Sequence, residues 1–252
     1  MPYRVERQLT LNLPRSAVWK FLTDPELITE WFADCSHLAP GDAFRFDFGD
    51  GDYFAGRVAG WEPPNLLHLK WKFCNLGPEF DIVYMLADAG GDATELRVSD
   101  TGSLSAEGAE GLSEGWKDFL SRLEQRISSG KPSRYLWSQT IGIAALADRD
   151  PEEVWSAITD PAWIAGAFGD AASIEAIEGR EMRLHFRRDA WRDKATEATV
   201  GVSDVDGKAY VGVVHAGWTD LPEAQQIAER ARFLGLWSDA LQQLETVAAS
   251  QV

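Results

Sequence analysis

Apolar and polar residues alternate over residues 5–13, and this period of two predicts a half-buried β-strand. The same alternation recurs at regular spacing through the first half of the chain. Glycine, proline, asparagine and aspartate separate the alternating segments, as is typical of turns between strands. The pattern therefore predicts five further strands, over residues 44–48, 53–61, 66–73, 80–86 and 94–100.

Helices are predicted before and after this run of strands. Pro14 opens a short helix, and a second one begins with Asp24 as N-cap and Pro25 as first helical residue. After the last strand, apolar side chains repeat at helical spacing from Trp116 to Ile127. The order of one strand, two short helices, five strands and one long helix predicts an α+β layer, in which the last helix covers the apolar face of an antiparallel sheet.

The chain repeats this order in its second half. The sequence from Val18 to Pro25 recurs, with changes, 136 residues later, and Trp116 of the long helix has a counterpart in Trp237. Residues 128–133 are rich in glycine, proline and serine, a composition that suits a linker. We therefore predict two copies of one domain, over residues 1–130 and 135–252.

The second copy is shorter in its middle and lacks about one hairpin. Gly217 follows Phe168 by 49 residues, whereas Gly102 follows Phe32 by 70. This copy is predicted to contain a strand over residues 139–146, helices within 151–168, about four strands up to His215, and a long helix within 222–249. The long helix is expected to bury the apolar side chains of Ile227, Ala231, Leu234, Trp237, Leu241 and Leu244.

Composition and charge narrow the classes of function. Hydrophobic residues make up 45% of the 252 residues and charged residues 25%, which is ordinary for a globular protein and excludes a disordered chain. The formal net charge of −16 repels phosphate groups, so neither nucleic acid nor an anionic membrane is an expected partner. The 11 tryptophans are unusual, and they indicate large apolar cores or cavities lined by rings.

Cysteine use and targeting signals bear on location. Cys35 and Cys74 are the only cysteines, too few for a disulfide framework, and both are predicted to be small buried hydrophobes. No stretch resembles a signal peptide or reaches the roughly 18 apolar residues of a membrane span. The expected location is the reducing cytoplasm.

Several motifs of the first half occur in the order of a known family. They begin with the segment from Pro14 to Pro25 and the pair Trp31-Phe32. The later motifs are Pro40 to Phe46, Trp61 to Pro64, Trp71, Thr94 to Gly102, and Gly115 to Leu123. As a set they resemble the bacterial branch of the activator of heat-shock-protein-90 ATPase homologue family, in the START-like (SRPBCC, helix-grip) superfamily. Residues 135–250 match only the first and last motifs.

The resemblance implies two helix-grip (START-like) domains, each a curved antiparallel sheet around a long C-terminal helix, with two short helices after the first strand. In this superfamily a cavity between sheet and helix often takes apolar ligands. The eukaryotic co-chaperone of the family has a separate chaperone-binding domain, and no part of this sequence resembles it. Because the fold hosts transport, cyclisation and sequestration alike, the resemblance does not decide the function.

No catalytic or cofactor motif accompanies the resemblance. The sequence contains no P-loop, Rossmann glycine set, zinc-protease helix, nucleophile elbow or C-x-x-C pair. The four histidines, His37, His68, His185 and His215, share no metal-ligand spacing. We therefore predict neither a metal nor another cofactor, and we expect His68 and His185 on a solvated face.

Aromatic side chains expected to point inward form the candidate binding site. Such rings either fill a packed core or line a ligand pocket, and both interpretations stay open. Polar candidates beside them are Asp47, His37, Tyr84 and Asp100; the last ends a strand near Gly102, where it could act as an acid or base or cap a turn. The predicted ligand-binding residues are Trp31, Phe32, Phe44, Phe46, Trp71, Phe73, Tyr84, Asp100, Trp116 and Phe119.

Three functions follow from these features. The lack of catalytic motifs favours non-enzymatic binding of a small apolar molecule, mainly by the first copy, with the second copy in support. One alternative is a cyclase/aromatase-like or hydrolase-like enzyme, which needs a polar group with a perturbed pKa inside the cavity. The other is a chaperone-associated or protein-interaction module, which needs an exposed apolar patch. A homo-oligomer, or a pseudo-dimer of the two copies, is compatible with each.

Overall fold

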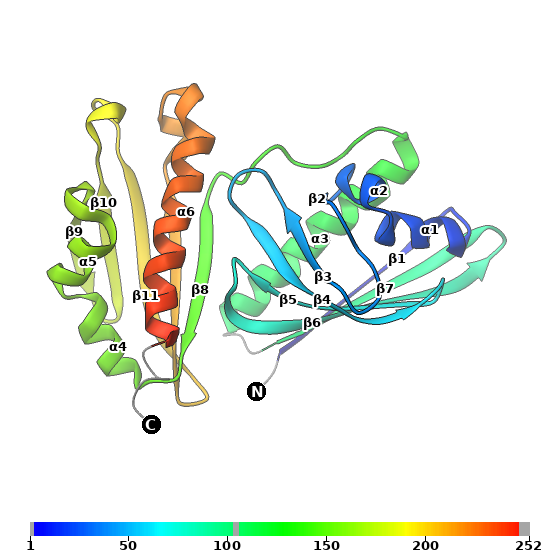
Figure 1. Cartoon of the computed structure of the whole chain (residues 1–252), viewed down its shortest axis with the longest axis horizontal. Coiled ribbons are helices and arrows are strands. Elements are labelled where there is room, and N and C mark those ends of the chain that lie inside the picture. Colours follow the sequence, from blue (N-terminus) through cyan, green and yellow to red (C-terminus); the bar gives the residue numbers. More distant parts are fainter. Residues whose placement is uncertain (1–2, 103–105, 247–252) are drawn as a thin grey trace. The chain divides into compact units, whose positions relative to one another are not determined.

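The computed structural model describes residues 3–102 and 106–246, and the chain forms two compact units. The first comprises the residues up to Gly49 together with Tyr53–Leu136. The second comprises Asp50–Asp52 and the residues from Trp137 onward. Each unit is built on one antiparallel sheet with a long helix after its last strand (Figure 1).

The first unit contains a seven-stranded sheet in the order β1-β7-β6-β5-β4-β3-β2. The first strand therefore pairs with the last, and each later strand pairs with its neighbour along the chain. Its elements are β1 (Tyr3–Leu11), α1 (Arg15–Thr23), α2 (Pro25–Thr29), β2 (Asp34–Cys35), β3 (Ala43–Asp47), β4 (Tyr53–Glu62), β5 (Leu66–Phe73), β6 (Leu76–Gly90), β7 (Ala93–Gly102) and α3 (Ala106–Ser129).

The second unit contains a five-stranded sheet in the order β8-β12-β11-β10-β9. It repeats the plan of strand, two helices, strands and long helix. Its elements are β8 (Ile141–Ala147), α4 (Pro151–Ile158), α5 (Pro161–Phe168), β9 (Ala172–Glu178), β10 (Glu181–Phe186), β11 (Thr196–Val205), β12 (Lys208–Ala216) and α6 (Glu223–Thr246), with short 3-10 turns at Gly169–Ala171, Asp189–Trp191 and Trp218–Asp220.

The helix starts follow the predicted capping chemistry. The side chain of Asp24 accepts a hydrogen bond of 3.0 Å from the backbone N–H of Glu26, which satisfies one free donor at the start of α2. Asp160 does the same for α5 in the second unit, through the N–H of Ala162. Pro14 differs from the prediction, because it is the N-cap of α1 and the helix begins one residue later.

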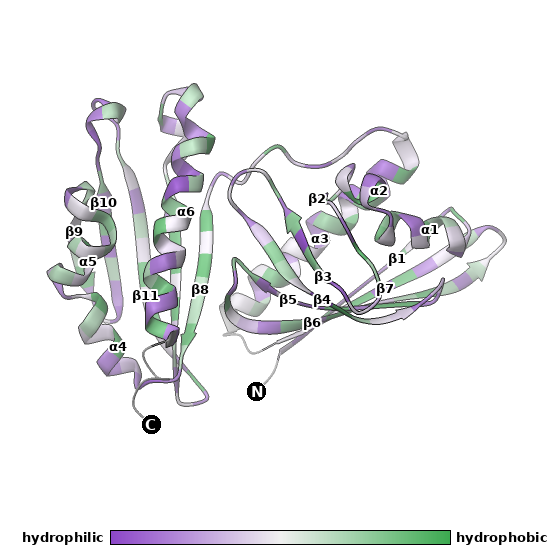
Figure 2. Ribbon diagram, viewed as in Figure 1, coloured by the Kyte–Doolittle hydropathy of each residue, from purple (hydrophilic) through white to green (hydrophobic). Residues whose placement is uncertain are grey.

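Alternation places apolar side chains on the face of each sheet that is covered by the long helix. In the first unit Leu69, Ile82 and Val98 are buried on this inner face. The outer face carries ion pairs such as Arg57–Glu79 at 2.7 Å and is exposed, so these pairs contribute little stability. Figure 2 shows the same alternation as hydrophobic and hydrophilic stripes along β11 of the second unit.

Two strand assignments differ from the sequence prediction. The short strand β2 was not predicted, because it is too short to show an alternating pattern. Strand β6 begins at Leu76 rather than at residue 80, because Cys74 and Asn75 form a two-residue hairpin turn with φ of 50° and 58°. Gly77 and Pro78, which are common in turns, hide this early start of the strand.

Two members of the predicted buried set on the last helix need correction. Ile227 is 41% exposed and Ala231 is half-buried, whereas Leu234, Trp237, Leu241 and Leu244 are buried as predicted. The first buried position of α6 is occupied instead by a charged residue, Arg230. Hydrophobic periodicity cannot identify it, because its burial depends on polar partners.

Arg230 is fully buried within the second unit, and its partners come from distant parts of the sequence. Its guanidinium donates hydrogen bonds of 2.9 Å to both carboxylate oxygens of Asp52 and to the carbonyl of Asp50. It also donates one of 2.7 Å to the carbonyl of Thr140. Several bonds of this kind are what a buried charge requires to be tolerated.

Candidate functional site

A cluster of aromatic rings occupies the space between the sheet and α3 in the first unit. Phe32, which follows α2, lies at its centre, and its ring centroid lies 4.8 Å from that of Phe119 and 6.4 Å from that of Trp71. Trp71 of β5 stacks in turn on Trp116 of α3, with centroids 6.1 Å apart. The rings are therefore supplied by the segment after α2, by the strands and by the long helix.

The structure brings the predicted site residues together. Ring contacts link all nine predicted aromatic residues into one cluster. Phe73 and Phe119 are half-buried. The other eight predicted residues are buried, namely Trp31, Phe32, Phe44, Phe46, Trp71, Tyr84, Asp100 and Trp116. Three further members were missed, namely Phe48, Phe54 and Tyr135. The first two lie in segments that the alternation had already identified as strands or their ends.

Asp100 places a carboxyl group inside this apolar cluster. The side chain is 1% exposed, and its Oδ2 accepts a hydrogen bond of 2.7 Å from the indole N–H of Trp116. Its Oδ1 has no hydrogen-bond partner among the described residues. Burial raises the pKa of this carboxyl to about 7; the Trp116 N–H opposes the shift, and the charge of Asp81 adds to it. Near neutral pH a large share of Asp100 is therefore protonated.

Tyr84 lies beside Asp100 on the same face of the sheet. In the pairing of β6 with β7, Tyr84 is opposite Val98 and Asp100 is opposite Ile82, so the two side chains are diagonal neighbours. The ring of Trp116 contacts that of Tyr84 edge-on at 5.9 Å. Burial, and to a lesser degree the charge of Asp100, raises the pKa of Tyr84 above its ordinary value, so the phenol keeps its proton.

The structure corrects three polar predictions. His37 is exposed and bonds Asp42 at 2.7 Å, and Asp47 bonds Arg45 at 2.9 Å, so neither side chain faces the aromatic cluster. Asp100 does not cap a turn, because its carboxyl bonds the side chain of α3. The alternation of β7 could have shown that Asp100 points inward, since Leu96 and Val98 on the same face are buried.

The interior of the second unit holds its own buried titratable group. His215 is fully buried; its Nδ1 accepts a hydrogen bond of 3.0 Å from Trp237, and its Nε2 lies 2.8 Å from the hydroxyl of Thr196. Because Nδ1 is an acceptor, the ring is neutral with its proton on Nε2. Burial lowers the pKa of His215 to about 3, which keeps it neutral. In this interior, Trp191 Nε1 has no hydrogen-bond partner.

Other predicted residues take structural positions. Cys35 and Cys74 are buried thiols, as predicted. His68 is half-buried on the outer face and lies 2.8 Å from Asp81, and His185 is half-buried on β10. Among residues 3–102 and 106–246, no group of three or more histidine, cysteine, aspartate or glutamate residues is placed to hold a metal ion.

The length and apolar character of the helices bear on membrane insertion. Within the part of the chain that the structure describes, no helix is both long enough and apolar enough to cross a bilayer.

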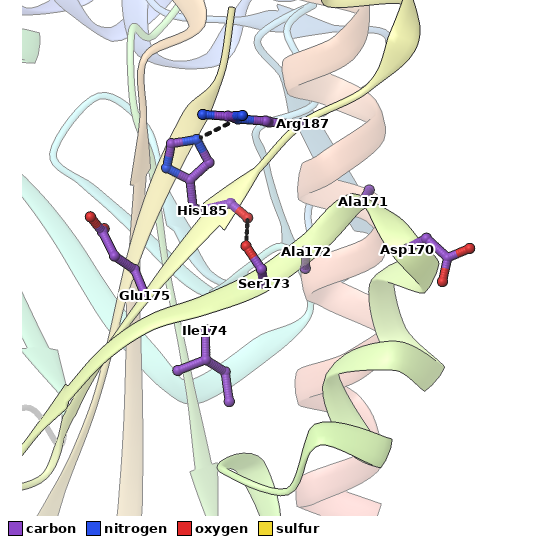
Figure 3. Close-up of a pocket in the computed structure, with 8 residues that line it drawn as sticks. All are labelled: Asp170, Ala171, Ala172, Ser173, Ile174, Glu175, His185 and Arg187. Carbon is purple, nitrogen blue, oxygen red and sulfur yellow. Dashed lines mark hydrogen bonds between the residues drawn. The ribbon is translucent and has the colours of Figure 1, made fainter.

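Two surface hollows lie away from the aromatic cluster. One, of about 720 Å³, is lined by Asp24, Pro25, Glu26, Thr29, Cys35 and Ser36. The other, of about 440 Å³, is in the second unit; in Figure 3 the Nε of Arg187 donates to Nε2 of His185, and Asp170 points away from this pair. Its lining residues are Asp170, Ala171, Ala172, Ser173, Ile174, Glu175, His185 and Arg187. Neither hollow is lined by a predicted site residue.

Comparison with known proteins agrees with this architecture. Residues 12–128 match the family model described as activator of Hsp90 ATPase homolog 1-like protein. Among solved structures, DynU16, a protein in the dynemicin biosynthetic locus, is 27% identical, with a TM-score of 0.83 over 97% of this chain and 98% of its own. MLL2253 from Mesorhizobium loti is 26% identical, with a TM-score of 0.45 over 51% of this chain and 98% of its own. CalU16 from Micromonospora echinospora is 23% identical, with a TM-score of 0.43 over 52% of this chain and 87% of its own.

The family match and the match to DynU16 confirm the resemblance that the sequence motifs predicted. The family match lies in the first half of the chain, and the match to DynU16 extends over both halves. The chain is therefore a tandem protein of the helix-grip type, a fold that suits ligand binding. None of the curated proteins matches it.

Proposed function

We propose that this tandem helix-grip protein, whose first domain carries the family match, binds a small apolar molecule between the sheet and α3 of that domain. The single observation that carries the proposal is Oδ1 of Asp100, a buried carboxyl oxygen set among aromatic rings, which has no partner in the described part of the chain. The predicted ligand-binding residues surround it.

An unpartnered polar atom in this position calls for an explanation. Buried polar groups are almost always hydrogen-bonded, because leaving one unpaired costs about 1–3 kcal/mol. A hydrophobic side chain at position 100 would avoid that cost while preserving the packing. Ligand pockets, by contrast, are mostly apolar with a few polar groups that fix the ligand's orientation. Asp100, a polar residue surrounded by aromatic rings, fits this description of a ligand pocket.

The rings fill the space themselves in this structure. Phe32 contacts both Trp71 and Phe119, so a ligand must displace some of these contacts as it enters. Because ring contacts are individually weak, a flat aromatic molecule can replace them with stacked or edge-on contacts of the same kind. We therefore propose an opening between α3 and the sheet on binding.

Relatives favour a small molecule over a protein as the ligand. DynU16 aligns with both domains and belongs to a biosynthetic locus, a setting in which a small-molecule binder is useful. The printed name of the family refers instead to activation of an ATPase, which would be a protein contact. An apolar surface patch would support that alternative, whereas the aromatic residues described above lie inside the domain.

Acid catalysis is the second candidate function, and one observation favours it. Burial gives Asp100 a pKa of about 7, the range in which a general acid works. Catalysis would also need a nucleophile or a second polar group placed against the substrate. The neighbouring polar side chain is Tyr84, whose raised pKa holds its proton, so the pair is better suited to hydrogen bonding than to proton exchange.

The second domain is proposed to support the first rather than to bind. Both ring nitrogens of its buried His215 have partners within the chain, and the indoles of Trp218 and Trp237 donate to this residue. The unpaired N–H of Trp191 is a weaker signal than a carboxyl oxygen, because a neutral donor costs less to bury.

Native mass spectrometry of the protein purified from its own source organism tests the proposal. We expect a retained small molecule that is lost in Trp71→Ala and Trp116→Ala and kept in the control Trp61→Ala. Trp61 belongs to the same domain but packs on Trp19, with ring centroids 5.2 Å apart. Near-ultraviolet circular dichroism checks that each variant is folded.

Two outcomes would contradict the proposal. A wild-type protein with the bare sequence mass, which also fails to take up apolar probes, would indicate a closed core. Loss of the bound molecule in Trp237→Ala, with retention in Trp116→Ala, would place binding in the second domain.

A further inference from the structure

We infer that the molecule held in the first domain carries a carbonyl oxygen, and that Asp100 and Tyr84 both donate hydrogen bonds to it. This inference rests on the proposed function and specifies the class of ligand. It follows from which oxygen of Asp100 is occupied and which is free, and from the position of Tyr84 beside it.

Asp100 has one occupied and one free oxygen. Oδ2 accepts the hydrogen bond of 2.7 Å from Trp116, so a proton held by this carboxyl belongs on Oδ1. Oδ1 is the atom that has no partner. Burial raises the pKa of the group to about 7, so the protonated form is well populated at neutral pH. Asp100 thus presents a buried O–H donor that lacks an acceptor within the described chain.

Tyr84 supplies a second donor on the same face. The diagonal pairing of β6 with β7 brings its side chain beside that of Asp100, and the ring of Trp116 contacts Tyr84 while its N–H holds Asp100. Trp116 therefore fixes both side chains. Two neutral O–H groups on one apolar wall suit a single oxygen acceptor, because a carbonyl oxygen has two lone pairs.

A ligand amine fits this site less well. An ammonium group would require the ionised carboxylate, and burial among rings disfavours that charge. Aromatic rings do attract cations, but an ammonium ligand would give the O–H of Asp100 no acceptor. Arg7, which lies on the inner face of β1 opposite Val98, is engaged by the backbone and hydroxyl of Ser113 on α3.

The test compares two probes of nearly the same shape with the full-length protein. 1-Tetralone carries a carbonyl group and tetralin lacks it, and equilibrium dialysis measures the affinity of each. The variants are Asp100→Asn, Asp100→Leu and Tyr84→Phe. Asparagine can accept from Trp116 through its oxygen and donate through its amide, whereas leucine can do neither.

For wild type we expect 1-tetralone to bind about tenfold more tightly than tetralin, as expected for a partnered carbonyl group. Asp100→Asn should preserve most of this preference. Asp100→Leu and Tyr84→Phe should each reduce it by about tenfold, and near-ultraviolet circular dichroism checks that these variants are folded.

Other outcomes overturn the inference in distinguishable ways. Equal affinity for both probes in wild type refutes the carbonyl contact but leaves the apolar binding site standing. A preference that survives in Asp100→Leu means that Asp100 does not donate to the carbonyl oxygen. Failure of folded wild-type protein to bind either probe at its solubility limit contradicts the proposed function itself.

Discussion

The indole N–H of Trp116 donates a hydrogen bond of 2.7 Å to Oδ2 of Asp100, joining the long helix α3 to the last strand of the first sheet. This bond crosses the apolar interior and leaves the second carboxyl oxygen unpartnered. Asp100 thus connects the sheet to the helix through Oδ2 and presents Oδ1 to the aromatic cluster. Both consequences can be measured.

The first prediction concerns the pH dependence of the first domain. The pKa of Asp100 is about 7 when folded, against an ordinary value of 3.8, so the folded state holds its proton more tightly. As pH rises from 3.8 to about 7, the unfolded state loses its proton first, and the free energy of unfolding falls by about 4 kcal/mol at about 1.4 kcal/mol per pH unit. Asp100→Asn should remove this decrease in the free energy of unfolding.

Urea unfolding at pH 4.5, 6 and 8 measures the effect, with a spectroscopic signal from the first domain as the readout. The control is Asp42→Asn, since Asp42 is an exposed carboxyl whose side-chain partner is His37. Parallel pH profiles for wild type and Asp100→Asn would show that burial does not perturb Asp100 in the folded state.

The second prediction has the opposite sign and concerns the second domain. Burial lowers the pKa of His215 from 6.5 to about 3, so the folded state holds the proton less tightly than the unfolded state. As pH falls from 6.5 towards 3, the second domain loses about 1.4 kcal/mol of unfolding free energy per pH unit. Above pH 6.5 this contribution is constant.

Thermal unfolding at pH 7.5 and 4.5 tests it. His215→Leu should be less stable at pH 7.5, because Trp237 and Thr196 lose a partner, but its stability should depend less on pH. The matched control is His37→Leu, an exposed histidine outside this interior. If the variant and wild type lose stability equally at pH 4.5, another group is responsible.

Sequence periodicity captures the faces of the sheets because a strand's side chains alternate sides without regard to the rest of the fold. Leu96, Val98 and Asp100 share a face by spacing alone, so the inward position of Asp100 was predictable. Its bond to Trp116 was not. That contact depends on the position of α3 along the sheet, and the packing of both elements determines this position.

Burial of charged and polar residues was harder to predict for a related reason. Arg230 reads as a solvated residue on an amphipathic helix, yet it is fully buried because Asp52 and Thr140 meet its guanidinium. His215 differs, because alternation places it on the same face as the buried Val211 and Val213. Partners far away in the sequence decide the burial of Arg230, and helical periodicity contains no information about them.

The third prediction separates the N–H of Trp116 from its ring. Trp116→Phe keeps an aromatic ring in the cluster but removes the donor, so both oxygens of Asp100 become unpartnered. The pKa of Asp100 should rise further, since the N–H is the interaction that opposes the effect of burial. Carbon-13 NMR of the Asp100 carboxyl measures this shift. In the control Trp61→Phe the Asp100 resonance should titrate as in wild type, and an identical titration in Trp116→Phe would contradict the hydrogen bond.

The last prediction concerns the buried cation of the second unit. Arg230→Met removes the charge but keeps much of the side-chain volume, and it leaves the carboxylate of Asp52 without its two hydrogen bonds of 2.9 Å. Breaking a buried pair on one side costs about 3–5 kcal/mol, because the remaining charge stays desolvated. Arg230→Met paired with Asp52→Asn should recover part of this loss, since the Asp52 side chain is then neutral, whereas Asp50, 3.7 Å from the guanidinium, still loses its ion pair. Arg232→Met, two residues along the same helix and half exposed, is the control and should change stability little. Chemical unfolding of the three variants checks the order, and a double variant no more stable than Arg230→Met would show that lost packing, rather than the stranded carboxylate, causes the damage.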